Sequence, residues 1–371
     1  MKILFLGDYS GLHGCLHREL RRRGYSVTLV SDGCGYMRTS SDVALVRNSG
    51  VFGAVGYVGR ILANMPRWRG YDVVQLSSTI FFSLRPSRIR AIFDWLRRHN
   101  RAVCLTSMSL DACLVKNLDS GGLFRYSEFR IGSELSPLQK ACPGLVGEWT
   151  TDEMMNHCEY IYSKVDAVMP VLYEYWLNAR YCNTSKVFYT GIPIDFSTLP
   201  PVREAARGCG RLKLFLGRKT DYMLHKGTDM LLEAARKVVA DYPDRCELAL
   251  AENMSLDEYL RRLAGSDIVL DQIYSYTPAT NALQAMAMGK VAVSGGEPEY
   301  YRFIGEDSLL PVVNVTPRYD DIVSALSALV SDRQHVAALG AMGPAFVKKH
   351  NDVGLVADRF VNAWNEILGG K

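Results

Sequence analysis

The chain has 371 residues and a mass of 41.4 kDa, a length that exceeds one ordinary core and suits two domains of about 100–200 residues each. With 48% apolar and 22% charged residues, the composition excludes disordered and fibrous proteins. The net charge of +4 is unevenly divided: residues 1–130 carry 19 Lys and Arg against 9 Asp and Glu, whereas residues 131–371 carry 24 against 30.

In the basic segment 1–130, Arg residues are clustered and interleaved with aromatic residues. The clusters are Arg21–Arg23, Arg67–Arg69, Arg85–Arg90 and Arg97–Arg98. Such clusters suit an anionic membrane surface, a phosphate-bearing substrate or nucleic acid, and they equally suit solvated helix faces. The start, MKILFLGD, is too short an apolar run for a secretory signal, and no later run approaches the roughly 18 residues of a membrane span. We therefore expect a cytoplasmic protein whose membrane contact, if it makes one, is peripheral.

The nine Cys form no C-x-x-C pair and no spacing interleaved with His of the kind typical of metal sites. Reduced, mostly buried thiols are the simpler interpretation. We expect no metal site.

From the N-terminus on, apolar runs of strand length alternate with amphipathic stretches of helix length. Strands are expected at KILFLG, SVTLVS, DVVQLSS and AVCLTS, and helices at 12–23 and 87–99. This alternation predicts a parallel sheet with crossover helices.

The first strand-to-helix turn contains Gly11, His13 and Gly14. We expect this turn near a cleft, where His13 could contact phosphates or an acceptor; an exposed His without a function is the alternative. Together with Gly7, the glycine spacing differs from that of a dinucleotide-binding turn, so a nicotinamide enzyme is disfavoured.

Between residues 117 and 150 the alternation is lost over a stretch longer than a normal loop. Loops of this length are usually functional. Arg125, Tyr126, Glu128 and Arg130 would suit polar recognition of a sugar or a phosphate, and a plain excursion with short helices is the alternative.

A Pro- and Gly-rich break at 191–210 predicts an interdomain linker. The alternation then restarts, with strands at RLKLFLG, CELALA, DIVLDQ, KVAVSGG and SLLPVV and helices at 229–240, 256–264, 279–288 and 319–330. We predict an α/β protein with two doubly wound Rossmann-like parallel-sheet domains facing a cleft, 1–190 and 191–352. The segment 353–371 holds a helix whose apolar stripe packs back on the first domain.

The loop GRKTDYMLHKG, residues 217–227, places Gly217, Arg218 and Lys226 between a predicted strand and a predicted helix. Ligands of open parallel sheets lie at the carboxyl ends of strands, and a helix N-terminus favours an anion. A bidentate Arg and a mobile Lys together suit a diphosphate. Surface cations near a helix start are the alternative.

The stretch YSYTPATNALQAMAMGKVAVSGGEPEYY, residues 274–301, gathers polar and aromatic groups at the start of a helix of small residues and at a Gly-Gly turn. It predicts a nucleotide pocket, with tight packing of Ala and Met as the alternative. The candidate ligand-binding residues are Tyr276, Thr280, Asn281, Gln284, Gly295, Gly296 and Glu297.

These two stretches, with YLRRLAGSDIVLDQ between them and VFYTGIPID before them, resemble in order and spacing the donor-binding domain of the family 4 retaining glycosyltransferases, which have the two-domain GT-B fold. The resemblance covers roughly residues 187–364 and is looser in the first half. It implies that Arg218 and Lys226 are the catalytic cations that grip the diphosphate of a nucleotide sugar. It also implies retention by a front-face path, in which the departing phosphate helps to deprotonate the acceptor hydroxyl and no separate protein base is needed. No cofactor is expected, and no metal, because no Asp-x-Asp motif follows a strand.

The family usually has two Glu eight positions apart, where this sequence has Tyr276 and Gln284. Gln284 can hydrogen-bond a ribose hydroxyl, whereas Tyr276 does not replace a carboxylate near the sugar. The family also tends to place His after the strands that match VVQLSS and VCLTS, and this sequence has none there.

The leading hypothesis is a hexosyltransferase that acts on a glycan or a lipid-linked glycan in surface polysaccharide assembly, with its basic first domain on the inner membrane face. A catalytically inactive nucleotide-sugar-binding or scaffold protein is the alternative, and a nucleotide-sugar epimerase is a further one. Nucleic acid is not expected as a partner.

Overall fold

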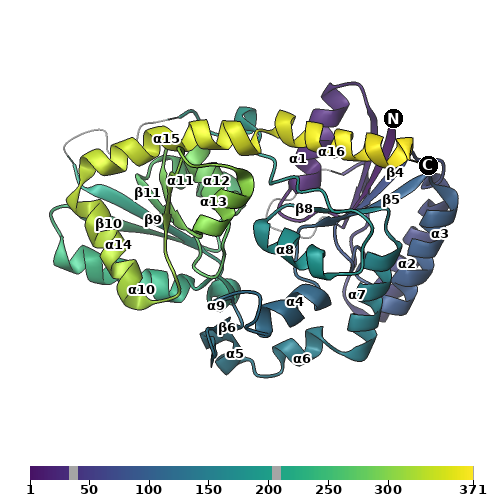
Figure 1. Cartoon of the computed structure of the whole chain (residues 1–371), viewed down its shortest axis with the longest axis horizontal. Helices are drawn as coiled ribbons and strands as arrows, with labels where there is room; N and C mark the ends of the chain where they lie inside the picture. The colour runs from purple at the N-terminus through teal and green to yellow at the C-terminus, as the bar shows by residue number, and fades with distance from the viewer. Residues whose placement is uncertain (33–40, 203–209, 371) are drawn as a thin grey trace. The chain divides into compact units, whose positions relative to one another are not determined.

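The computed structural model describes residues 1–32, 41–202 and 210–370, which form two compact units (Figure 1). The first unit consists of residues 1–116, 147–193 and 353–371, and the second of residues 117–146 and 194–352. Each unit is built around its own parallel sheet with crossover helices. The predicted α/β class with two doubly wound parallel-sheet domains is confirmed.

The six-stranded sheet of the first unit has the order β3-β2-β1-β4-β5-β8, and every neighbouring pair is parallel. Its strands are β1 (Lys2–Leu6), β2 (Ser26–Ser31), β3 (Val43–Ala44), β4 (Val73–Leu76), β5 (Ala102–Ser107) and β8 (Ala167–Pro170). The helices are α1 (Leu12–Arg22), α2 (Gly50–Asn64), α3 (Pro86–His99), α6 (Leu145–Trp149), which starts just before the boundary, α7 (Asp152–Lys164), α8 (Tyr173–Tyr181) and α16 (Val353–Gly369). The sequence patterns did not predict α2, α7 or α8.

Side chains of β1 alternate between two apolar cores because successive residues of a strand point to opposite faces. Leu4 and Leu6 belong to the core that also contains side chains of α2, α3 and α7. Ile3 and Phe5 belong to the core that contains side chains of α1 and α16. Both faces of the sheet are therefore covered, as the uninterrupted apolar run of β1 requires.

The final helix returns to the first unit, as expected. Trp364 is fully buried, and its ring centroid lies 6.2 Å from that of Phe5 in β1. Figure 1 shows α16 alongside α1, and Arg23 at the end of α1 pairs with Asp358 at 2.5 Å. The apolar stripe of residues 353–368 thus completes one face of the first sheet.

The five-stranded sheet of the second unit has the order β10-β9-β11-β12-β13, again all parallel. Its strands are β9 (Leu212–Arg218), β10 (Cys246–Glu252), β11 (Ile268–Leu270), β12 (Val291–Ser294) and β13 (Val312–Asn314). The helices are α9 (Met223–Lys226), α10 (Thr228–Asp241), α11 (Leu256–Ala264), α12 (Thr280–Ala287), α13 (Pro298–Ile304), α14 (Tyr319–Ser331) and α15 (Arg333–Asn351). The sequence patterns did not predict α9, α13 or α15.

Residues 117–146 belong to the second unit, whereas the sequence placed them in the first domain. This segment begins within α4 (Ala112–Asp119) and holds the hairpin β6 (Arg130–Ile131) and β7 (Glu134–Leu135) and the short helix α5 (Pro137–Ala141). The physical reason is a set of polar contacts that Arg125, Tyr126 and Glu128 make with side chains of the second unit. Part of the expected linker, residues 203–209, lies outside the described residues.

Candidate functional site

The loop after β9 holds the two predicted cations. Arg218 ends β9, its side chain is 15% exposed, and its Nη2 lies 2.6 Å from Glu252 Oε1. Its Nη1 points at the thioether sulfur of Met223, a weak acceptor 3.9 Å away. Lys226 ends α9, with a half-exposed side chain whose Nζ is 3.6 Å from Asp271 Oδ1. Each cation is therefore positioned by a carboxylate and keeps N–H donors for an anion.

A left-handed glycine joins this loop to α10. Gly227 has φ 67°, and a Cβ there would lie 2.3 Å from Ile273. The backbone N–H of Ile273 donates to the carbonyl of Lys226 at 3.1 Å, which pins the loop to the chain that follows β11. The N-cap residue of α10 is Gly227, which has no side chain to cap the helix, and Asp229 is the acidic residue of its first turn. The N–H groups of this helix end favour a negative charge.

Asp271, which the sequence reasoning left without a role, connects Lys226 to α12. It follows β11 directly, is 1% exposed, and accepts hydrogen bonds from Asn281 Nδ2 at 3.0 Å and Ser294 Oγ at 3.2 Å. An Asp immediately after a buried strand was the available signal, because the carboxyl ends of parallel strands share one sheet edge. Lys226 and the predicted Asn281 are thus brought together by a residue that we had not proposed.

The remaining predicted residues around α12 lie at the same end of the sheet. Thr280 and Gln284 are half-buried in α12, and Thr280 is its first residue. Asn281 accepts a hydrogen bond from the Tyr259 hydroxyl at 2.5 Å. Gly217 lies against the same Tyr259 ring, which a Cβ would approach to 2.1 Å.

A second group forms around Glu297, which is 4% exposed at the start of α13. Its carboxylate accepts hydrogen bonds from the Tyr126 hydroxyl at 2.5 Å, Arg125 Nη2 at 2.6 Å and Asn314 Nδ2 at 3.1 Å. Gly296 donates its N–H to Asn314 Oδ1 at 2.8 Å. A Cβ at Gly295 would lie 1.8 Å from a backbone carbonyl, so the Gly-Gly turn is required for this packing.

Tyr276 belongs to the group around Glu297. Its ring stacks on that of Tyr126 with centroids 4.8 Å apart, and the Arg125 guanidinium lies 5.1 Å from its centroid. Its hydroxyl accepts the backbone N–H of Arg125 at 2.6 Å, and burial raises the pKa of the phenol. Tyr276 is therefore covered by residues 125–126 of its own unit.

The segment 117–146 thus contacts two residues of the candidate site, Tyr276 and Glu297. Arg125 also pairs with Glu299, and His225 Nδ1 lies 2.5 Å from Glu128 Oε2. Arg125 and Tyr126 were noted in the sequence, but their partners Glu297 and Tyr276 are more than 140 residues away. No pattern in the sequence predicts a pairing at that separation.

The turn between β1 and α1 corrects the expectation that His13 faces a cleft. His13 is fully buried, with Nδ1 2.7 Å from the Gly7 carbonyl and Nε2 2.9 Å from Thr106 Oγ1. Burial lowers the pKa of His13 to about 4. The ring is neutral and structural.

An internal carboxylate occupies the N-terminus of α1. Asp8 accepts hydrogen bonds from the backbone N–H groups of His13 at 3.0 Å and Gly14 at 3.3 Å. Gly11, the N-cap residue of α1, has φ 73°. The helix end that we expected near a ligand is therefore already filled.

Helix α2 exposes an apolar stripe that sequence reasoning missed. Val51, Phe52, Val55 and Leu62 share one face of the helix and are 77%, 94%, 66% and 59% exposed. The helix contains no acidic residue, and Arg60 is exposed on it. Within the described part of the chain, every helix falls short of the length and apolar character that crossing a bilayer requires.

No protein-family model matches the chain, and no curated protein matches it. Several solved structures do. Sucrose-phosphate synthase from Thermosynechococcus elongatus matches over 100% of both chains with 12% identity and a TM-score of 0.67. Anabaena HepE in complex with UDP-glucose matches over 99% of this chain and 100% of its own, with 12% identity and a TM-score of 0.61.

A Listeria monocytogenes protein described as a candidate UDP-N-acetylglucosamine 2-epimerase also matches, over 100% of this chain and 97% of its own, with 12% identity and a TM-score of 0.58. At such low identity, these matches show the fold alone. The chain has the GT-B fold.

Proposed function

We propose that this protein is a glycosyltransferase that binds a nucleotide diphosphate sugar in its second domain, residues 191–352 joined by residues 117–146. One observation supports this most strongly. Arg218 and Lys226 flank the loop between β9 and the glycine N-cap of α10, each held by one carboxylate and each with donors left for an anion. That HepE, which has the same fold, binds UDP-glucose supports the same assignment.

In the proposed reaction, Arg218 and Lys226 stabilise the negative charge that develops on the leaving diphosphate. Such electrostatic stabilisation of the transition state is usually the largest single contribution to catalysis. Two cations supply this stabilisation without a metal or a cofactor. The bond from the anomeric carbon to the diphosphate breaks, and the acceptor oxygen attacks from the same face while the departing phosphate takes the proton of the acceptor hydroxyl. Attack on that face gives retention. Asp271 would hold Lys226 in place, and Asn281 and Gln284 would contact the nucleoside.

The sugar would lie toward the group around Glu297. Tyr276 is not a substitute for a carboxylate there, because its hydroxyl is already engaged by the Arg125 backbone. Glu297 and Glu299 provide the nearby carboxylates instead, and Arg125 pairs with both. We propose that this group, with Gly295 and Gly296, shapes the pocket for the transferred sugar.

The test is a thermal-shift and product-release panel of UDP, GDP, ADP, CMP and TDP sugars on the wild type and on the double variant Arg218→Ala/Lys226→Ala. A matched control is Arg211→Ala, since Arg211 forms a similar pair with Glu247 at 2.6 Å at the other end of β9 and β10. We expect one donor to stabilise the wild type and Arg211→Ala but not the double variant.

Three other outcomes would contradict the proposal. Stabilisation without turnover in the presence of any glycan acceptor would favour a binding or scaffold protein. Conversion of the donor to a nucleotide sugar of altered stereochemistry would favour an epimerase. If the donor stabilised the double variant as much as the wild type, Arg218 and Lys226 would not be part of the donor site.

We further propose that the acceptor is a glycan or a lipid-linked glycan of surface polysaccharide assembly, presented at an anionic cytoplasmic membrane face that the first domain contacts. The exposed stripe of α2 would enter the lipid, and exposed arginines would contact the headgroups. Each cation near such a surface contributes about 1 kcal/mol. Arg21, Arg22 and Arg23 contribute less, because Asp42, Glu19 and Asp358 already pair with them.

Sedimentation with anionic vesicles tests this contact. Val51→Ser/Phe52→Ser and Arg97→Glu/Arg98→Glu should each reduce the bound fraction, whereas Leu310→Ser, a change at an exposed apolar residue of the second unit, should not. Equal sedimentation of all variants would contradict the membrane proposal and leave the donor proposal intact.

A further inference from the structure

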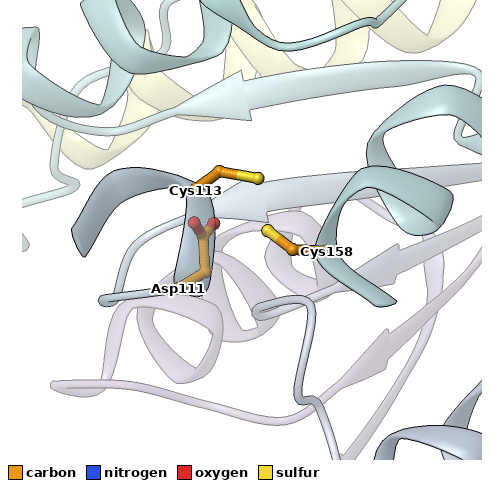
Figure 2. A group of neighbouring side chains, drawn as sticks. All are labelled: Asp111, Cys113 and Cys158. Atoms are coloured by element: carbon orange, nitrogen blue, oxygen red, sulfur yellow. The ribbon is translucent and has the colours of Figure 1, made fainter. Parts of the chain in front are cut away.

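Two thiols and a carboxylate gather inside the first unit, soon after the end of β5. Asp111 begins the turn into α4, Cys113 lies in the first turn of α4, and Cys158 lies in the middle of α7. They are 3%, 8% and 1% exposed. One ligand atom from each lies within 4.8 Å of the others, and Figure 2 shows the three side chains converging.

A fourth residue lies beside this group. Cys182 follows the last residue of α8, and its thiol is a neighbour of the Cys113 thiol. The group of three thus comes from the start of α4 and from α7, with Cys182 next to Cys113 at the end of α8. No metal motif is visible in the sequence because these residues lie far apart along the chain. Cys113 and Cys158 are 45 residues apart, and Cys158 and Cys182 are 24 residues apart.

The carboxylate of Asp111 makes two hydrogen bonds, accepting from the Leu114 N–H at 2.9 Å and from the Tyr162 hydroxyl at 2.9 Å. Within residues 1–32, 41–202 and 210–370, no Lys, Arg or His forms an ion pair with it. A buried carboxylate without a cation is unfavourable, and a bound metal ion would supply the missing positive charge.

From this arrangement we infer that Asp111, Cys113, Cys158 and Cys182 form a structural zinc site. Three sulfur ligands and one oxygen ligand satisfy the four-coordinate preference of Zn²⁺, and soft thiolates disfavour Mg²⁺ and Ca²⁺. Each thiol that coordinates the ion loses its proton to the solvent, so binding releases protons. The Tyr162 hydroxyl donates to Oδ2 of Asp111 and the Leu114 N–H to Oδ1, so the oxygen that does not bind the ion keeps a hydrogen-bond partner, as metal-ligating carboxylates usually do.

The ion would tie α4, α7 and α8 together at the end of β5. Because α4 leads directly into residues 120–146, it would also fix the start of the segment that holds Arg125 and Tyr126. The inference does not depend on the proposed transferase activity, and the ion takes no part in that reaction.

The first test is elemental analysis of wild-type protein that has been incubated with Zn²⁺ under reducing conditions and then desalted. We expect about one zinc ion per chain, and less than a tenth of that in Cys113→Ser and in Cys158→Ser. Cys246→Ser is the matched control, a buried thiol of the second unit, and should retain the ion. Zinc absent from the wild type, or lost equally from the control, would overturn the inference.

A second measurement needs no variant and so does not depend on whether a Ser variant folds. Co²⁺ added to the wild type should give an intense sulfur-to-metal charge-transfer band and tetrahedral visible bands. Zinc should protect the partly exposed Cys182, but not the exposed Cys142, from alkylation mapped by mass spectrometry. A cobalt spectrum without thiolate bands, or equal alkylation with and without zinc, would overturn it.

Discussion

The two units use the same element, a strand followed by a turn and a helix, in opposite ways. Between β1 and α1 the helix N-terminus is filled by the carboxylate of Asp8, and His13 is buried and neutral. Between β9 and α10 the N-cap residue is a glycine, and Arg218 and Lys226 lie in the loop. The comparison shows that a glycine-containing turn at a sheet edge does not by itself make an anion site, because an internal carboxylate can occupy it.

The largest expected effect is on catalysis. Arg218→Ala/Lys226→Ala should lower the rate of sugar release or transfer by about 100-fold or more, since preorganised charge for the leaving group is lost. Arg211→Ala, which breaks a similar ion pair at the opposite sheet edge, should change the rate less than twofold. Rates that fall equally in both variants would mean that the two ends of β9 do not differ in function.

The second effect concerns the pH dependence of the first unit. The pKa of His13 is lowered to about 4 from 6.5 in the unfolded chain, so between these values the unfolded chain binds a proton that the folded chain does not. The contribution of His13 to stability should therefore be nearly fully present at pH 7 and fall by about 2 kcal/mol between pH 7 and pH 5.

Trp fluorescence during urea unfolding measures this effect, because all five Trp lie within the first unit. His13→Gln should remove this part of the pH dependence, whereas substitution of the exposed His335 should not. If the free energy of unfolding of His13→Gln changes with pH as steeply as that of the wild type, other groups cause the pH dependence.

A smaller effect is expected at the cap of α1. Asp8→Ala should destabilise the first unit by about 1–2 kcal/mol, because two backbone N–H groups lose their acceptor. Donor affinity should not change. Asp358→Ala is the control, a 57% exposed partner of Arg23, for which we expect about 0.5 kcal/mol or less. A loss of donor affinity in Asp8→Ala would give the first turn a binding role and contradict the comparison.

The smallest effect is expected at the contact between residues 117–146 and the rest of the second unit. Tyr126→Phe removes the hydrogen bond to Glu297 and keeps the ring stacked on Tyr276, so it should cost about 1 kcal/mol in calorimetric unfolding of this unit. Its effect on donor affinity should differ between sugars on the same nucleotide. An effect that is identical for every sugar would place Tyr126 outside the sugar pocket.

Much of the fold was predictable because period and length alone distinguish strands from helices. The runs at β1, β2, β5 and β9 match the structure closely, and so does the helix 256–264. Helix α2 escaped prediction because it is apolar on nearly every side, which removes the contrast that marks an amphipathic helix.

The site was predictable in part. The placement of Arg218 and Lys226 in a loop at the carboxyl edge of a sheet could be predicted, because the strand before this loop is evident in the sequence. The role of Asp271, the burial of His13 and the contacts of Arg125 with Glu297 and Glu299 depend on long-range packing, which has no local signature. The cluster of Asp111 with Cys113 and Cys158 was hidden for the same reason.

The most direct test of the central claim is calorimetric titration with a nucleoside diphosphate and the corresponding monophosphate, using the base that the donor panel selects. Wild type and Arg211→Ala should bind the diphosphate at least about tenfold more tightly than the monophosphate, a difference of about 1.4 kcal/mol. In Arg218→Ala/Lys226→Ala the two affinities should become nearly equal. A double variant that still prefers the diphosphate by the wild-type ratio would contradict the assignment of the β9–α10 loop as the diphosphate site.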